Sequence, residues 1–151
     1  MSTLETRLHE DLTAAIRSRD EVSSATLRMA LTAVKNEAVS GTDARELTDA
    51  DVVTVLGREA KKRRESATAY DDAQRPELAA RERAELAVLV GYLPAQLSDE
   101  ELAALVAAAV AETGADSPRQ MGNVMKVLTP RIAGRADGGR VAAVVRGALG
   151  A

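Results

Sequence analysis

Apolar residues recur every three or four positions along nearly the whole chain, which is the spacing of one face of an α-helix. The first helix opens with Ser2 and Glu5, a pair typical of a helix start, and its apolar stripe begins at Leu4. The stripe consists of Leu4, Leu8, Leu12 and Ile16. No segment shows the strict alternation of a half-buried strand, so the pattern predicts helices throughout.

Three further helices are expected before residue 94. They are predicted over 20–40, 48–71 and 76–93. Gly41 stands where a glycine commonly ends a helix, and Thr48 with Asp51 gives a second start signal. Pro76 suits the first position of a helix, whereas Pro94 cannot continue one. Pro94 therefore lies at the predicted domain boundary.

Three shorter helices are predicted after that boundary, beginning at Ser98, Ser117 and Asp137. The first stops at Gly114, and the second has Pro130 near its end. Ser98 and Asp137 are good N-caps for the first and the last of them. We therefore predict an all-α protein with a helical N-terminal domain, residues 1–93, followed by a three-helix C-terminal tail domain, residues 95–151. A unit of under 60 residues buries little apolar area, so we expect it to dock on the N-terminal helices or on a partner.

Composition narrows the classes of protein that fit this pattern. Tyr70 and Tyr92 are the only aromatic residues among the 151, so the core must be built from Ala, Leu and Val with some Met. The absence of Cys excludes a disulfide framework, a thiolate zinc site and a cysteine nucleophile. Charges run through the first 20 residues, and no stretch has the length and apolarity of a membrane span. We expect a protein of the cytoplasm without a membrane partner.

Charge is distributed unevenly along the sequence. The net charge is −3, but residues 117–151 hold six cations against one carboxylate, a net of +5, which leaves −8 for residues 1–116. An acidic body with a basic end is an asymmetry that a binding function could explain.

Signatures of an active site are missing. The sequence has no phosphate-binding glycine loop, no metalloprotease motif and no serine-hydrolase elbow. His9, the single histidine, is expected at the surface of the first helix. Glu82 and Glu85 have the i, i+3 spacing of helix-borne metal ligands, but no histidine follows at the required offset. We predict no catalytic residue, no metal site and no cofactor.

The run KKRRE at 61–65 is the densest group of cations. Four consecutive side chains on a helix point in different directions, so we interpret the run as a solvated face. The alternative is a contact with phosphates, aided by Arg58.

The segment MGNVMKVLTPRIAGRADGGR, residues 121–140, is the better candidate for an anion contact. Glycines would let another backbone approach and permit positive φ in the turn, and helix starts attract anions. The candidate residues are Gly122, Lys126, Arg131, Gly134, Arg135, Gly138 and Arg140. Spacing alone does not decide between this interpretation and a tight helical hairpin whose glycines serve packing only.

Four stretches of the sequence resemble the GatB/YqeY family, and more closely its YqeY-like proteins. They are LRMALTAVKNEAV (27–39), KKRRESATAY (61–70), ELAVLVGYLPAQLSDEEL (85–102) and MGNVMKVLTPRIAGRADGGRV (121–141). The last is similar to the tail of GatB, a subunit of the glutamine-dependent tRNA amidotransferase. Its G-x-V-M-K run is matched from Gly122 to Lys126, and its G-K-A-N turn is replaced by GRAD at 134–137.

The resemblance implies two all-helical domains and a tail that helps to hold tRNA. It also implies the family label of carbon–nitrogen ligase with glutamine as amido-N-donor, although the catalytic portion of GatB has no counterpart here. We therefore expect a non-catalytic module that binds tRNA, or a protein partner in tRNA metabolism, through the seven residues of 122–140. The alternatives are a protein-interaction adaptor without nucleic acid, whose basic tail docks on its acidic body, and an amidotransferase component that needs other subunits.

Overall fold

The computed structural model describes residues 1–150, and within that range it contains seven α-helices, one short 3₁₀ helix and no strand. The predicted all-α class is confirmed. The α-helices are α1 (Thr3–Arg17), α2 (Glu21–Ala38), α3 (Asp49–Asp72), α4 (Pro76–Val90), α5 (Asp99–Thr113), α6 (Met121–Ile132) and α7 (Gly138–Ala148). The 3₁₀ helix η1 (Pro118–Gln120) directly precedes α6.

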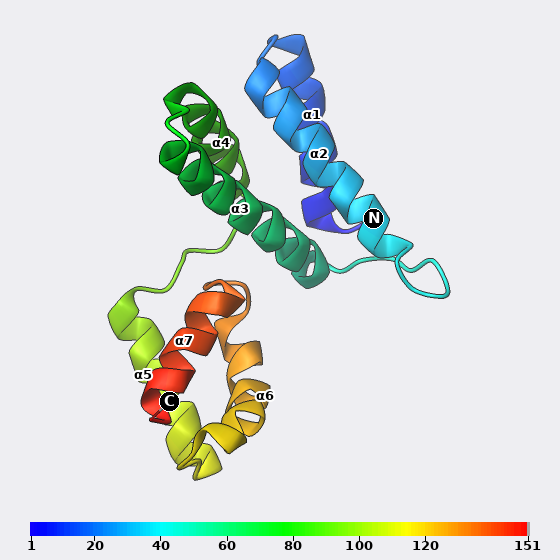
Figure 1. Ribbon diagram of the computed structural model, residues 1–151. Coiled ribbons are helices and arrows are strands. Elements are labelled where there is room, and N and C mark those ends of the chain that lie inside the picture. Colours follow the sequence, from blue (N-terminus) through cyan, green and yellow to red (C-terminus); the bar gives the residue numbers. More distant parts are fainter. Residues whose placement is uncertain (151) are drawn as a thin grey trace. The chain divides into compact units, whose positions relative to one another are not determined.

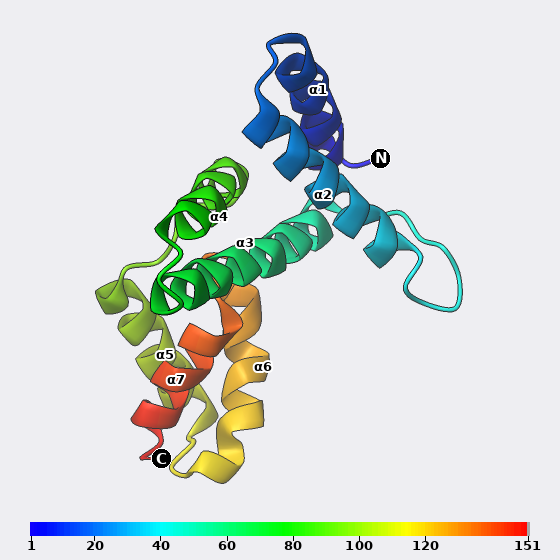
Figure 2. The same ribbon diagram turned by 45° about the horizontal axis from the view of Figure 1, so that its top comes forward.

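The helices fall into two compact units, residues 1–93 and residues from Pro94 onward. In the N-terminal unit, α1 pairs with α2 and α3 pairs with α4, each as a helical hairpin (Figures 1 and 2). In the C-terminal unit, α5 packs against both α6 and α7. Each unit encloses its own cluster of buried Leu, Val and Ala residues, as the scarcity of aromatic residues requires.

Helix starts follow the local cap signals. The Thr48 and Asp51 side chains each accept a hydrogen bond from the other residue's backbone N–H, which forms a capping box at the start of α3. The Ser98 hydroxyl accepts from Glu101 N at the start of α5, and Asp137 accepts from two backbone N–H groups at the start of α7. These oxygens pair donors that the first helical turn would otherwise leave open.

One predicted helix end is wrong, and another is confirmed. Helix α2 stops at Ala38 with Val39 as its cap, so Gly41 lies beyond the end and does not terminate it. Helix α6 ends at Ile132, so Pro130 lies near its end as predicted. Proline lacks the N–H that would bond four residues back, but in the last turn this removes one bond only, and the helix closes through Ala133 in the left-handed region.

Candidate functional site

The turn between α6 and α7 carries most of the residues that the sequence singled out. Ala133 and Gly134 both adopt positive φ, at 48° and 78°. The turn therefore uses Gly134 as predicted. Gly138 does not serve the turn, because Asp137 caps the helix and makes Gly138 its first residue, with a helical backbone. The predicted role of Gly138 in permitting positive φ is wrong.

Arg135 and Arg140 fasten the segment that leads into α5. Arg135 Nε donates to Ala95 O at 3.0 Å, and Arg140 Nη1 donates to Leu97 O at 2.8 Å. Leu97 N in turn donates to Arg135 O at 2.7 Å. Each guanidinium also meets a carboxylate near the start of α5, Arg135 with Glu101 at 3.4 Å and Arg140 with Asp99 at 2.7 Å. Both arginines thus have a structural task within the C-terminal unit.

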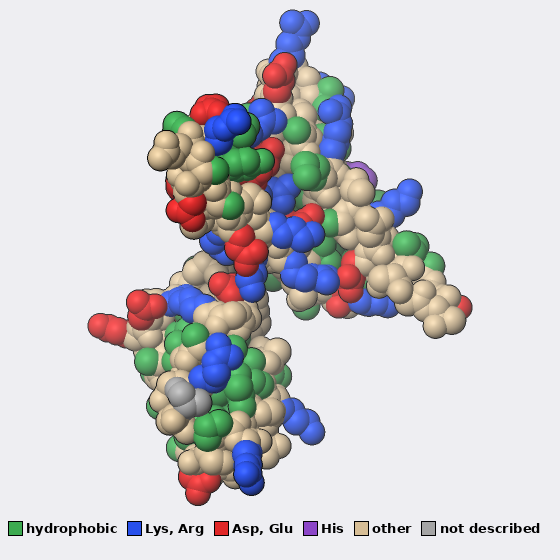
Figure 3. Space-filling model, viewed as in Figure 1, with side chains coloured by type: hydrophobic (Ala, Val, Ile, Leu, Met, Phe, Trp, Pro, Cys, Tyr) green, Lys and Arg blue, Asp and Glu red, His purple; other side chains and the backbone are tan. Residues whose placement is uncertain are grey.

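Arg131 is bound at the other end of α5. Its Nη1 lies 2.6 Å from Glu112 Oε2, and this hydrogen bond raises the pKa of the Arg131 guanidinium. Glu112 follows Glu101 by eleven helical residues, which is about 16 Å at 1.5 Å per residue. The carboxylates that hold Arg131 and Arg135 are therefore well separated. In the view of Figure 3 the Lys and Arg side chains of this unit form separate groups rather than one continuous patch.

Lys126 and Gly122 share an exposed face of α6. They are four residues apart, one helical turn, and both are exposed. Within residues 1–150 the Lys126 ammonium has no ion pair. A Cβ added at Gly122 would find nothing within 4 Å, so no neighbour requires glycine there. The same holds for Gly138, which removes internal crowding as the reason for either glycine.

The charge asymmetry of the sequence does not follow the division into units. Residues 94–151 hold six cations and six carboxylates, a net charge of zero, whereas residues 1–93 hold 14 cations and 17 carboxylates, a net of −3. The asymmetry arose because the sequence was divided after residue 116. That division separates Arg131, Arg135 and Arg140 from their carboxylate partners on α5. These arginines find carboxylates inside their own unit.

Comparison with known protein families shows which family this chain belongs to. The sequence matches the family described as Yqey-like protein over residues 5–149, which covers both units. The chain belongs to the YqeY-like family. No curated protein matches it. The resemblance to YqeY-like proteins noted from the sequence is thus confirmed.

In this YqeY-like chain the KKRRE run is not a uniform solvated face, because Arg63 is buried with 4% of its surface exposed. Its Nη1 donates to Glu59 O at 3.0 Å, its Nε lies 3.6 Å from Glu85 Oε2, and its Nη2 donates to Met29 Sδ at 3.7 Å. Arg63 falls on the apolar stripe of α3. That stripe runs through Val52, Leu56, Ala60, Arg63 and Ala67. The spacing of this stripe places Arg63 on the buried side of α3. The interpretation as a solvated face rested on the charges of the run and not on that spacing.

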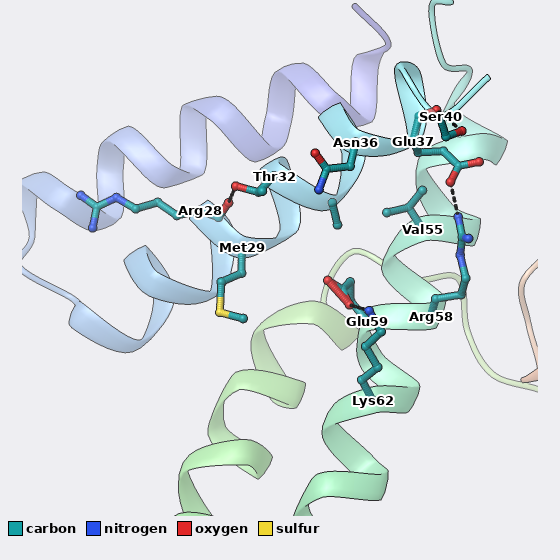
Figure 4. A pocket seen from close by; sticks show the side chains of 11 residues that line it. Arg28, Met29, Thr32, Asn36, Glu37, Ser40, Val55, Arg58, Glu59 and Lys62 are labelled. Carbon is teal, nitrogen blue, oxygen red and sulfur yellow. Dashed lines mark hydrogen bonds and ion pairs between the residues drawn. The ribbon is translucent and has the colours of Figure 1, made fainter. Parts of the chain in front are cut away.

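A groove of about 520 Å³ lies between α2 and α3 of the N-terminal unit (Figure 4). Met29, Ala33 and Val55 supply its apolar surface. Its cations are Arg28, Arg58 and Lys62, and its carboxylates are Glu37 and Glu59. The groove also contains Thr32, Asn36 and Ser40 from α2 and the residues that follow it. Arg58, considered from sequence as a phosphate contact, pairs with Glu37 at 2.8 Å.

His9, Glu82 and Glu85 are the other residues that the sequence raised as possible reactive groups. His9 is exposed, as predicted. Glu85 contacts Arg63 and Arg81, and residues 1–150 bring no three His, Cys, Asp or Glu side chains together in a way that could hold a metal ion. Within the same residues, no helix combines the length and apolarity needed to cross a membrane.

Proposed function

We propose that this YqeY-like protein is a non-catalytic module whose C-terminal unit contacts tRNA. The observation that supports this most directly is the exposed pair of Gly122 and Lys126 on α6. Glycine costs up to about 1 kcal/mol relative to alanine in a helix, and less in the first turn, where Gly122 lies. Neither positive φ nor a crowded neighbour accounts for glycine at position 122. A partner backbone that approaches closely beside an unpaired ammonium accounts for both features.

The proposed interface also includes the turn between α6 and α7. Arg131 and Arg135 are each about 40% exposed in their ion pairs with Glu112 and Glu101. Exposed pairs of this kind contribute at most about 1 kcal/mol, so a phosphate can replace the carboxylate without a large penalty. Gly134, Gly138 and Arg140 shape this surface. Arg140 does so by holding the turn against the segment that leads to α5.

Binding through this surface is expected to be weak and insensitive to sequence. The unit has no net charge, and phosphate contacts fix position without distinguishing bases. The residues 94–151 contain no aromatic side chain on which a base could stack. Recognition would therefore rest on the shape and the phosphates of a folded RNA.

The resemblance of 121–141 to the tail of GatB supports an association with glutamine-dependent amidation of aminoacyl-tRNA, which would place the protein in the cytoplasm. The label of carbon–nitrogen ligase with glutamine as amido-N-donor would then describe a complex and not this chain alone. Purified protein incubated with glutamine should release no glutamate. Release that follows the protein through purification would contradict a non-catalytic role.

An anisotropy titration with fluorescein-labelled bulk tRNA tests the RNA contact. We expect Kd to rise steeply between 50 and 200 mM salt, since each phosphate contact releases counterions. Lys126→Glu should weaken binding at least about fivefold, because it replaces an attractive charge at a phosphate with a repulsive one. Lys35→Glu, on an exposed position of α2, makes the same change in net charge and serves as the matched control. Equal effects of the two variants, or binding indifferent to salt, would contradict the proposal.

A second candidate function is a protein-interaction adaptor without nucleic acid. The neutral charge of the C-terminal unit favours it, because Arg131, Arg135 and Arg140 all have carboxylate partners already. Affinity capture from lysate with and without nuclease separates the two functions. Partners that persist after nuclease favour the adaptor, and partners released with the RNA favour tRNA binding.

A further inference from the structure

The groove between α2 and α3 has a chemistry that the proposed RNA contact does not use. It is formed entirely within the N-terminal unit, which carries a net charge of −3. That charge opposes a polyanion such as RNA. The groove itself differs from its unit, because its three cations outnumber its two carboxylates.

The two carboxylates of the groove are already neutralised. Glu37 lies 2.8 Å from Arg58 and 3.9 Å from Arg45, and Glu59 lies 3.1 Å from Lys62 and 3.9 Å from Arg63. Two of these cations, Arg45 and Arg63, come from outside the groove lining, where each also has a nearer carboxylate partner, Asp51 at 3.0 Å and Glu85 at 3.6 Å. Arg28 is exposed and has no ion pair among residues 1–150. Arg58 and Lys62 offset the two carboxylates of the lining, so Arg28 is the cation that gives the groove its attraction for negative charge.

The polar groups along α2 match a peptide backbone. Asn36 is exposed, and within the described residues its side-chain amide has no hydrogen-bond partner, so it offers both a donor and an acceptor. Thr32 and Ser40 give their hydroxyl protons to Arg28 O and Glu37 O, which leaves the hydroxyl oxygens as acceptors. Thr32 and Asn36 are about 6 Å apart along the helix, close to the roughly 6.6 Å that two residues of an extended chain span.

Apolar surface lies beside this polar row. Met29 is 52% exposed, a large fraction for a long apolar side chain, and Figure 4 shows Met29 and Asn36 projecting from α2 at the groove, with Arg58 and Lys62 on the α3 side. Ala33 and Val55 complete the apolar lining. From Met29 to Glu37 the groove follows about 12 Å of α2, the length of nearly four extended residues.

We infer that the α2–α3 groove binds an extended, acidic segment of a partner protein. Asn36 and the two hydroxyl oxygens pair with its backbone. Alternate apolar side chains pack on Met29, Ala33 and Val55, while its carboxylates meet Arg28, Lys62 and Arg58. Side chains of the two helices thus hold the extended peptide, and charge selects the ligand.

A titration with a defined probe tests the inference on the full-length protein. The probe is the peptide Gly-Asp-Val-Glu-Ala-Asp-Leu-Glu-Gly, followed by amide chemical shifts of the ¹⁵N-labelled chain. We expect a Kd of about 0.1 mM at low salt, with shifts confined to α2 and α3. A control peptide with Asn and Gln in place of Asp and Glu should bind at least about tenfold more weakly, since the charges steer and select the ligand.

Three variants separate the contributions of charge and of hydrogen bonding to the affinity for the peptide. Arg28→Glu should weaken binding at least about fivefold and reduce its salt dependence, because a charge contact is lost. Asn36→Ala should weaken it about fivefold and leave the salt dependence unchanged, because a neutral hydrogen bond is lost. Lys35→Glu, outside the groove, should change Kd less than about twofold. All three positions are exposed on α2, so folding is retained and is checked by the amide spectrum of the free protein.

Binding of the acidic and neutral peptides with equal affinity would overturn the inference. So would shifts on other helices, equal effects of Arg28→Glu and Lys35→Glu, or no response below about 2 mM peptide. Competition by bulk tRNA for the same amides would assign the groove to RNA instead. Because Lys126 lies on a different unit, loss of the RNA contact leaves this result unaffected.

Discussion

The phenolic hydroxyl of Tyr92 donates a hydrogen bond of 2.6 Å to Asp11 Oδ2, which joins the residues after α4 to the middle of α1. Arg7 covers the ring, with its guanidinium carbon 4.5 Å from the ring centroid, and its Nε lies 3.6 Å from the same Asp11 oxygen. One of only two aromatic residues in the chain thus fastens the first helix of the N-terminal unit to its last. Burial and the Asp11 carboxylate together raise the pKa of Tyr92.

Tyr92→Phe should lower the free energy of unfolding by about 1 kcal/mol, the usual contribution of one hydrogen bond. Phenylalanine keeps the ring and its contact with Arg7, so the loss is confined to the hydroxyl. Urea unfolding followed by far-UV circular dichroism measures the change. Tyr70→Phe is the matched control and should stay within about 0.5 kcal/mol. Equal losses for both tyrosines would mean that the Asp11 bond contributes nothing specific.

The same pair predicts a dependence on alkaline pH. The folded pKa of Tyr92 is raised above the unfolded value of about 10, so its contribution is complete below pH 10 and is lost as pH rises toward the folded pKa. The stability difference between the parent chain and Tyr92→Phe should therefore shrink from pH 9 to pH 11. Paired urea titrations at these pH values give the difference directly. A difference that is constant or grows with pH would contradict the shift.

Arg63 carries a larger expected effect because its partners are buried with it. The Glu59 and Glu85 side chains are only 11% and 13% exposed. Arg63→Met should lower the free energy of unfolding by about 2–3 kcal/mol, since it removes the buried cation that Glu59 and Glu85 share and leaves them only the exposed Lys62 and Arg81. Arg64→Met, one position along the same run, should change it by less than about 0.5 kcal/mol. Thermal or urea unfolding of the two variants side by side decides whether the run has one structural cation.

Helix starts could be predicted from the sequence more reliably than helix ends. The starts of α3, α5 and α7 were predicted because a cap and its partner lie within three residues of each other, at Thr48, Ser98 and Asp137. The all-helical class followed from the stripe spacing for the same local reason. The end at Gly41 was misplaced, because a glycine permits a stop without requiring one, whereas Pro130 lies near the end of α6 as predicted.

The ion pairs of the candidate site could not be predicted, because the carboxylate partners of its arginines are distant in sequence. Arg135 and Arg140 pair with carboxylates 34 and 41 residues away. Periodicity gives no information about such pairs, so the basic segment looked unopposed. The groove between α2 and α3 was not predicted at all. Its residues occupy two helices joined by a ten-residue connection, from Val39 to Thr48, and only the fold brings them together.

The glycines divide into two groups that substitution should separate. Gly114 ends α5 with φ at 67°, whereas Gly122 is helical and open to solvent. Gly114→Ala should lower the free energy of unfolding by about 1 kcal/mol, and Gly122→Ala should raise it by about 0.5–1 kcal/mol. Urea unfolding measures both. The sign of the change for Gly122→Ala is the deciding result. A lower free energy of unfolding would mean that packing within the chain requires this glycine, which would remove the main support for an interface at α6.

The last prediction separates the two interactions of Arg140. Its Nη2 pairs with Asp99, whose side chain is 98% exposed, while its Nη1 donates to the partly buried Leu97 carbonyl. The exposed pair should contribute little, so Asp99→Asn should change the free energy of unfolding by less than about 0.5 kcal/mol. Arg140→Leu should lower it by about 1–2 kcal/mol, because it leaves the Leu97 carbonyl without that donor.

Arg146→Leu makes the same substitution on an exposed position of α7 and is the matched control. If Asp99→Asn and Arg140→Leu destabilise equally, the ion pair and not the carbonyl bond holds the segment before α5. If Arg146→Leu equals Arg140→Leu, the effect belongs to the loss of a surface cation. If only Arg140→Leu destabilises the protein, the loss belongs to the hydrogen bond between Arg140 and the Leu97 carbonyl. That bond then holds α7 against the segment before α5, and so supports the surface that carries Lys126 and Arg131.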